Sequence, residues 1–296
     1  MSSDPRCACC DGPVSETRYR DQFGGAALVA CRRCGHIQTS VVPSAEAIAC
    51  YYAGKYSEHR SRFLDSTYFA VMQHRAEAQC RFLERSGLGI SGLRVCDVGC
   101  GYGALIQALT RRGAEATGLE YDPACVAHCC DLGLEVRRIT NEQEIEDLAD
   151  LDLVTLSHTL EHVRAPDGFL SRLRGRTRAV FLEVPNYSMR LPEQFRDQEG
   201  HIHFFNRRSL EHLLERLGLD SVDIAAYGPE LWLFWADGGA LPRRVMRRLS
   251  SDWFFGDYDV SRRRGIWTRA LARLEPAPAP AARFRDHDAG PSRQAL

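Results

Sequence analysis

The sequence lacks any apolar run of the roughly 20 residues that a membrane-spanning helix requires. Its first five residues also lack the basic start and apolar core of a secretory signal peptide, so the pattern predicts a cytoplasmic protein. Lys and Arg together number 38 against 39 Asp and Glu, which leaves a net charge of −1. A protein that binds a nucleic-acid phosphate backbone usually has an excess of basic residues, so the charge balance argues against nucleic acid as the partner.

Cysteine, by contrast, is abundant, with 12 residues. Without a secretion signal, so many cysteines indicate free thiols and metal ligands rather than a disulfide framework. Two pairs, Cys7-x-x-Cys10 and Cys31-x-x-Cys34, have the spacing of metal ligands. Four thiolates at this spacing suit a tetrahedral structural zinc ion. A small module with little hydrophobic core needs such a cross-link to be stable. Cys9 in place of Cys10, and a redox pair in place of the zinc site, are the alternatives.

Hydrophobic periodicity and composition divide the chain into five segments. Residues 1–43 contain the cysteine pairs and are expected to form the zinc-ribbon module. Residues 44–90 read as a helical linker or cap, and residues 91–239 as the main domain. A helical extension is expected over residues 240–274, with helices at 241–249 and 266–274. Residues 275–296 are rich in Pro and Ala, which predicts a disordered tail.

Short β-rich runs alternate with helical stretches in the main domain, which indicates βαβ units. We therefore expect an α/β fold: a doubly wound, mostly parallel, seven-stranded Rossmann-like sheet, with the small zinc-binding module and the helical cap added. The strands are expected over residues 94–97, 115–120, 134–139, 151–156, 179–184, 220–226 and 231–235.

A glycine-rich turn follows the first of these strands, in the run LRVCDVGCGYG at residues 93–103. Glycines let the backbone pass close to a ligand, and the helix that follows offers unpaired N–H groups. Glu120 ends the next strand, about 20 residues on, where an acidic side chain accepts hydrogen bonds from ribose hydroxyls. Asp97, at the end of the first strand, would repel a pyrophosphate but suits the cationic amino-acid end of a ligand.

The turn resembles the first motif of class I S-adenosylmethionine-dependent methyltransferases. The resemblance continues through LDLVTLSHTLEHV (151–163), FLEVPN (181–186) and HIHFFN (201–206), which look like later motifs of a subgroup found in polysaccharide and natural-product biosynthesis. It implies S-adenosylmethionine as cofactor, with Asp97 and the glycine loop at the methionine portion and Glu120 at the ribose. The expected cofactor-binding residues are Asp97, Gly99, Cys100, Gly101, Glu120, Tyr121, His158 and Tyr56.

Tyr56 enters this set through a second resemblance. The run YYAGKY at residues 51–56 resembles the tyrosine-rich segment that follows a zinc ribbon in sugar C-methyltransferases, where it folds over the cofactor pocket. Tyr52 and Tyr56 are therefore candidates to line the pocket, and ordinary helix packing is the alternative.

Histidines supply the candidates for proton transfer. His158-x-x-Glu161-His162 invites a metal-site interpretation, but the resemblance implies that this run lines the cofactor and the substrate. His201 and His203 alternate along an extended segment, so their side chains are expected to point in opposite directions. Because a neutral imidazole can take a proton near pH 7, His201 is the candidate general base, and His162 is the second catalytic candidate. A histidine that is only hydrogen-bonded in the pocket wall is the alternative for His201.

The sequence thus predicts an S-adenosylmethionine-dependent methyltransferase that acts on an oxygen or a carbon of a small-molecule acceptor. Proximity and orientation would provide most of the catalysis, because the sulfonium methyl group is already activated. A sugar, a nucleotide-linked sugar or a natural-product intermediate is the expected acceptor. RNA methylation with the zinc module as an RNA-binding element, and a catalytically silent binding or scaffold protein, are the alternatives.

Overall fold

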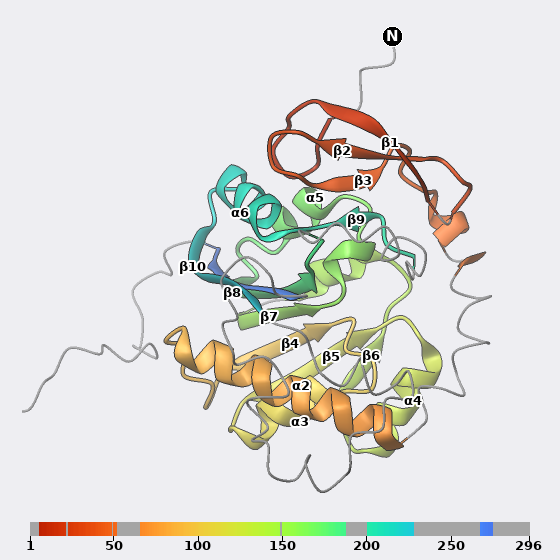
Figure 1. Ribbon diagram of the computed structural model, residues 1–296. Coiled ribbons are helices and arrows are strands. Elements are labelled where there is room, and N and C mark those ends of the chain that lie inside the picture. Colours follow the sequence, from red (N-terminus) through yellow and green to blue (C-terminus); the bar gives the residue numbers. More distant parts are fainter. Residues whose placement is uncertain are drawn as a thin grey trace, which may run out of the picture.

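The computed structural model describes residues 6–21, 23–48, 50–51, 66–148, 150–187, 200–227 and 267–274. Its strands form one sheet of four and one sheet of seven (Figure 1). The strands are β1 Val14–Arg20, β2 Ala27–Cys31, β3 Ile37–Thr39, β4 Arg94–Val98, β5 Glu115–Glu120, β6 Val136–Arg138, β7 Leu151–Ser157, β8 Thr177–Pro185, β9 His203–Phe204, β10 Asp220–Tyr227 and β11 Trp267–Arg273. The helices are α2 Ser66–Arg85, α3 Ala104–Arg111, α4 Pro123–Asp131, α5 Pro166–Arg172 and α6 Arg207–Arg216, with 3₁₀ turns η1 Glu142–Asp147 and η2 Leu160–His162.

The larger sheet has the strand order β10-β11-β8-β7-β4-β5-β6. The chain enters at β4, adds β5 and β6 on one side, and then crosses over to add β7 and β8 on the other. All of these neighbours pair in parallel, whereas β11 is antiparallel to both β8 and β10. The expected α/β fold with a mostly parallel, seven-stranded sheet is therefore confirmed. The winding reverses between β4 and β7, and ligands bind outside the carboxyl ends of the strands at such a point.

Six of the seven expected strands are present, as β4 to β8 and β10. The expected strand at 231–235 and the expected helix at 241–249 lie outside the described residues. The helix predicted over 266–274 is wrong, because Trp267–Arg273 is strand β11. This strand lies inside the sheet with both of its faces covered, so its apolar residues do not alternate with polar ones, and such a run cannot be told from a helix by its period. The remaining segment boundaries stay predictions.

Alternating side chains of the central strands pack into two cores, one on each face of the sheet. Along β8, Phe181 faces the core that contains Phe82 of α2, and the two rings lie 5.8 Å apart between centroids. Its neighbours Val180 and Leu182 face the opposite core, which contains Leu210 of α6. Figure 1 shows α2 and α3 together on one side of the sheet and α6 on the other. None of the helices that the structure describes is long and apolar enough to span a membrane.

The smaller sheet joins the N-terminal module to the main domain. Its order is β1-β2-β3-β9, and β9 comes from the chain between β8 and α6. Strand β3 pairs with β9 in antiparallel register, Ile37 opposite Phe204 and Gln38 opposite His203. The fourth strand of the module's sheet is therefore supplied by a segment more than 160 residues further along the chain.

A buried ionic cluster ties α2 and β11 to β8. The Glu183 carboxylate is fully buried and accepts hydrogen bonds from Arg75 of α2 and from Arg269 of β11, with the Arg75 Nε–Oε1 distance at 2.6 Å. Gln79 of α2 donates to the same oxygen at 2.7 Å. Burial by itself raises the pKa of Glu183, but the Arg269 and Arg75 charges outweigh it and hold the pKa below its ordinary value. Glu183 is therefore ionised at neutral pH.

Removal of this carboxylate should be strongly destabilising. Glu183→Ala leaves two buried guanidinium groups without their common counter-ion, so we expect a loss of about 3–5 kcal/mol in the free energy of unfolding, measured by urea titration. Arg111→Ala is the matched control, because its ion pair with Glu77 is half exposed and should be worth at most about 1 kcal/mol. A loss no larger than that of the control would contradict the structural role of Glu183.

Candidate functional site

The glycine loop lies between the carboxyl end of β4 and the first turn of α3. Gly99, Gly101 and Gly103 have φ values of 75°, 53° and 76°, in the left-handed region that favours glycine. A Cβ on Gly99 would lie 2.4 Å from Thr159 Oγ1, whereas a Cβ on Gly101 would meet nothing within 4 Å. The loop is therefore packed against η2 at its start and faces open space at Gly101, where a ligand can approach the backbone.

Two buried carboxylates flank the loop. Asp97, in β4, accepts a hydrogen bond from the Thr155 hydroxyl at 2.6 Å, and burial raises its pKa to about 7. Glu120, at the end of β5, accepts from the backbone N–H groups of Gly101 at 2.7 Å, Tyr121 at 2.6 Å and Asp122 at 2.9 Å. Burial raises the pKa of Glu120 as well, although these three hydrogen bonds oppose the shift. A carboxylate offers about four acceptor positions, so Glu120 keeps capacity for a ligand hydroxyl.

The other expected cofactor-binding residues differ in where they lie relative to this loop. Cys100 is buried in the loop itself, and Gly118 of β5 leaves the space that its sulfur occupies, since a Cβ there would lie 2.7 Å from Sγ. Tyr121 follows Glu120 and packs against the core that contains Val180 and Leu182. His158 follows β7, at the same edge of the sheet. Tyr56, together with Tyr52, lies outside the described residues.

His162 and His201 meet at the carboxyl edge of the sheet. Their ring centroids lie 4.7 Å apart, and Nδ1 of His162 donates to the carbonyl oxygen of Gly200 at 3.2 Å. Nδ1 of His201 is 2.8 Å from the Tyr187 hydroxyl. Burial lowers the pKa of His162 to about 4 and that of His201 well below its ordinary value, so both rings are neutral at pH 7. His203 faces the other way and contacts His36, so the expected opposite directions are found. The cause is not strand alternation, which would place residues two apart on one face, but the bend at Ile202, just before β9 begins.

A buried carboxylate, Glu161, lies beside these histidines. It is fully buried, and neither oxygen has a hydrogen-bond partner among the described residues, although Nδ1 of His158 is 3.3 Å from one of them. Burial raises the pKa of Glu161 to about 8. One oxygen of Glu161 and one ring nitrogen each from His162 and His201 all lie within 4.8 Å of one another. These three side chains have donor types that could hold a metal ion. The 3₁₀ turn η2 covers only Leu160–His162, so His158 and His162 do not lie on one face of an α-helix.

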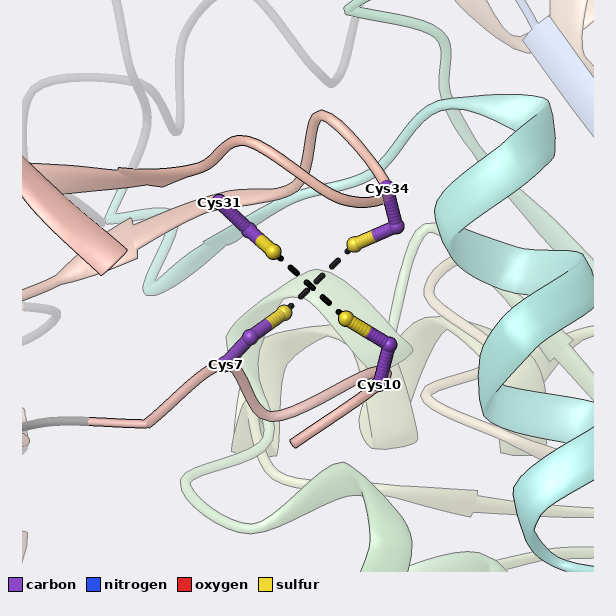
Figure 2. A group of neighbouring side chains, drawn as sticks. All are labelled: Cys7, Cys10, Cys31 and Cys34. Carbon is purple, nitrogen blue, oxygen red and sulfur yellow. Dashed lines mark hydrogen bonds between the residues drawn. The ribbon is translucent and has the colours of Figure 1, made fainter. Parts of the chain in front are cut away.

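Four cysteine sulfurs converge in the N-terminal module (Figure 2). The Cys7–Cys34 and Cys10–Cys31 sulfur pairs are each 3.5 Å apart, and all four sulfurs lie within 4.8 Å of one another. Sulfurs around a tetrahedral zinc ion, each at about 2.3 Å from the metal, are about 3.8 Å apart. Gly12 leaves room for the cluster, since a Cβ there would lie 3.2 Å from Cys10 Sγ. The group contains Cys10 and not Cys9, and its donors and spacing fit a zinc ion.

Sequence reasoning missed several residues of this region. Tyr187 follows a quoted motif but has no local pattern that marks it as a partner of His201. Trp267 packs edge-on against His158 with ring centroids 4.3 Å apart, and Arg75 lies over the same indole at 4.7 Å. Residue 267 was expected in a helix outside the sheet. Glu183 lies within the motif at residues 181–186, and the sequence pattern alone does not show that it meets two arginines.

The chain matches a family of proteins described as a methyltransferase domain over residues 58–224. Among curated proteins it is 41% identical over 85 residues to a ubiquinone biosynthesis O-methyltransferase of Alkalilimnicola ehrlichii, covering 26% of this chain and 34% of the relative. A Pseudomonas aeruginosa protein with the same description is 41% identical over 90 residues, covering 28% of this chain and 38% of the relative. The matched region thus spans little more than a third of the length of these relatives.

Two solved structures share the fold. Magnesium protoporphyrin IX methyltransferase from Synechocystis PCC 6803, with bound S-adenosylhomocysteine, has a TM-score of 0.52 and 14% identity, covering 78% of this chain and 99% of that chain. A methyltransferase from Thermotoga maritima, described as a possible histamine N-methyltransferase, has a TM-score of 0.50 and 15% identity, covering 77% of this chain and all of the other.

The raised pKa of Glu161 predicts a pH-dependent stability. Between pH 7.5 and 8 the folded state still holds part of a proton on this carboxyl that the unfolded state has lost, so the contribution of Glu161 to stability falls as the pH rises, by up to about 1.4 kcal/mol per pH unit for one proton. The buried histidines are neutral in the folded state and almost neutral in the unfolded state above about pH 7.5, so they contribute little in this window. They are His36, His158, His162, His201 and His203, whose pKa values are all lowered by burial. In urea titrations, Glu161→Gln should flatten the fall, while the contribution of Asp97, which also has a raised pKa, remains in both proteins. Equal slopes for the variant and the wild type would show that Glu161 is ionised when folded.

Proposed function

This chain belongs to the class I S-adenosylmethionine-dependent methyltransferases, and we propose that it transfers a methyl group to a hydroxyl oxygen of a small molecule. The observation that carries the proposal is the arrangement of the glycine loop between two buried carboxylates. Glu120 binds the backbone of Gly101 and so fixes the loop, and the missing Cβ of Gly101 leaves open space in front of it. Asp97 suits the cationic amino-acid end of the cofactor, and Glu120 suits its ribose hydroxyls.

The bound cofactor supplies an activated methyl group, and its transfer forms an oxygen–carbon bond while the sulfur–carbon bond breaks and S-adenosylhomocysteine leaves. The chain's own contribution is to hold the acceptor in line, to exclude water and to take the hydroxyl proton. His201 is the proposed base. If Nδ1 of His201 donates its hydrogen to the Tyr187 oxygen, Nε2 keeps a lone pair and can accept that proton. Neutral His162, at 4.7 Å between centroids, adds no positive charge that would oppose this step.

Oxygen is favoured over carbon as the methylated atom because the curated relatives are described as O-methyltransferases. The acceptor class that we propose is a sugar, a nucleotide-linked sugar or another natural-product intermediate, in keeping with the subgroup that the motifs resemble. We further propose that Cys7, Cys10, Cys31 and Cys34 bind a structural zinc ion, with residues 1–43 as a zinc-ribbon module.

Cofactor binding is the first test. We expect calorimetric titration of the zinc-loaded protein with S-adenosylhomocysteine to show binding that Asp97→Ala and Glu120→Ala each weaken at least about tenfold, through loss of charge-assisted hydrogen bonds. Glu115→Ala, at the exposed opposite end of β5, is the control that should bind normally. Failure of the wild type to bind would overturn the proposal and favour a binding or scaffold role.

The role of His201 predicts a separation between catalysis and binding. With a hydroxylated acceptor found by screening for S-adenosylhomocysteine release, His201→Asn should lower kcat by about 10²–10⁴-fold, because a general base contributes about that factor. The affinity for S-adenosylhomocysteine should stay unchanged, since the glycine loop is intact. His212→Asn, on α6, is the matched histidine control. An unchanged kcat in His201→Asn would assign His201 to the pocket wall.

A further inference from the structure

We propose that the four-cysteine module is a positioning element for His201: strand β3 of the module holds the segment 200–204, so that loss of the module's metal displaces His201 from His162 and Tyr187 while the glycine loop stays intact. His203 and His36 are the positioning residues in this arrangement. The inference rests on the proposed function for the role of His201, but the contacts that carry it are independent of that role.

Backbone hydrogen bonds hold the segment 200–204 from two sides. On the module side, β3 pairs with β9, and the N–H of Thr39 donates to the carbonyl of Ile202 at 3.0 Å. On the side of the main domain, the N–H of Ile202 donates to the carbonyl of Glu161 at 2.9 Å. Ile202 therefore lies between the module and η2 and is bonded to both. The residue just before it, His201, takes its position from this double attachment.

The side chains of this segment also point to two sides, one toward the module and one toward the main domain. His203 points toward the module, where its Nδ1 lies 3.1 Å from Nε2 of His36 and the two rings are stacked. Both rings are buried, at 2% and 0% exposure. Two residues earlier, His201 points the opposite way, toward Tyr187 and His162. The chain bends at Ile202, and β9 begins only at His203, so the two rings point to opposite sides although residues two apart in a strand share one face. Because His201 and His203 flank the doubly bonded Ile202, a movement of the segment that breaks the His36–His203 contact also displaces His201.

The metal site is connected to this contact by a short piece of chain. His36 stands two residues after Cys34, and β3 begins at the next residue, Ile37. The turn is closed by hydrogen bonds from the N–H of Cys31 to the carbonyl of His36 at 2.8 Å and from the N–H of Gly35 to the carbonyl of Cys31 at 2.9 Å. Four thiolates brought together need a cation to offset their repulsion, so without the metal this turn loses the constraint that places His36 and β3.

The glycine loop is held by hydrogen bonds to β5, which belongs neither to the module nor to the segment 200–204. Its N–H groups donate to the Leu119 carbonyl and the Glu120 carboxylate of β5, and its packing partner is Thr159. The carboxylates that the cofactor requires are held by Thr155 and by backbone groups of the loop. Loss of the module's metal is therefore expected to leave cofactor binding in place.

The test compares the zinc-loaded protein, with one zinc ion per chain, with the chelator-stripped protein. Loss of that ion in the variant Cys34→Ser assigns it to the four cysteines rather than to Glu161, His162 and His201. Histidine ring ¹⁵N signals report the tautomer and environment of His201, assigned with the variant His201→Gln, and those of His128 in α4 serve as the internal reference. We expect metal removal to shift the His201 ring signals and leave those of His128 in place, while the affinity for S-adenosylhomocysteine stays within about twofold. Zinc added back should restore the His201 signals.

Two results would overturn the proposal. His201 signals that stay unchanged after metal loss would show that the module does not position this ring. A parallel loss of S-adenosylhomocysteine affinity would show that the metal supports the whole domain rather than His201. If the zinc-loaded wild type itself fails to bind S-adenosylhomocysteine, the proposed function fails, whereas the ring signals still decide whether the metal positions His201.

Two substitutions of His203 distinguish a role in positioning His201 from a role in the stability of the protein. In the zinc-loaded protein, His203→Asn retains an amide group near the position of Nδ1 that can bond to His36, whereas His203→Leu fills the space without a polar atom. We expect His203→Leu to reproduce the His201 signals of the stripped protein and His203→Asn to keep those of the loaded wild type. Identical His201 signals in the two variants would count against the His36–His203 contact, and the chelator experiment remains decisive where either variant does not fold.

Discussion

The buried carboxylate of Glu183 is the charge on which the carboxyl edge of the main sheet depends. Arg75 and Arg269 come from elements nearly 200 residues apart in the chain, and both bond to this one group. Arg269 is fully buried in an interior strand, where a charge without a counter-ion would cost several kcal/mol. Strand β11 can therefore occupy its place between β8 and β10 only beside an ionised Glu183. Trp267, on the same strand, packs against His158, so the wall of the candidate site is built on this ion cluster.

The local sequence pattern was enough to predict the strands that are close in the sequence to their neighbours in the sheet. The expected bounds of β4 to β8 and β10 differ from the observed ones by no more than two residues, because each strand is an apolar run bounded by turn residues. β11 was not predicted as a strand for two reasons. Both of its faces are covered, so no alternation marks it, and its partners β8 and β10 precede it by at least 40 residues of chain. Sheet membership there follows from tertiary contacts rather than from local sequence.

The residues of the candidate site also fall into those that the sequence pattern marks and those that only the fold brings together. The glycine loop, Asp97 and Glu120 lie within two successive strands, and their spacing alone was enough to single them out. Tyr187 and His36 have no such signal: Tyr187 meets His201 across a chain segment outside the described residues, and His36 meets His203 at a separation of 167 residues. Each is one aromatic residue in an unremarkable run, and only the fold shows what it contacts.

The module and the main domain are parts of one structure rather than a domain with an appendage. With β1, β2 and β3 alone, the module would expose the unpaired edge of β3, and such an edge is prone to pair with other chains. Strand β9 covers that edge, and Arg216 of α6 donates to the carbonyl of Cys9 at 3.1 Å, beside the four-cysteine group. The contacts act in both directions. Because β3 pairs with β9, a metal bound by the four cysteines would order β9 together with the module. In return, the folded main domain presents to the module the strand that completes its sheet.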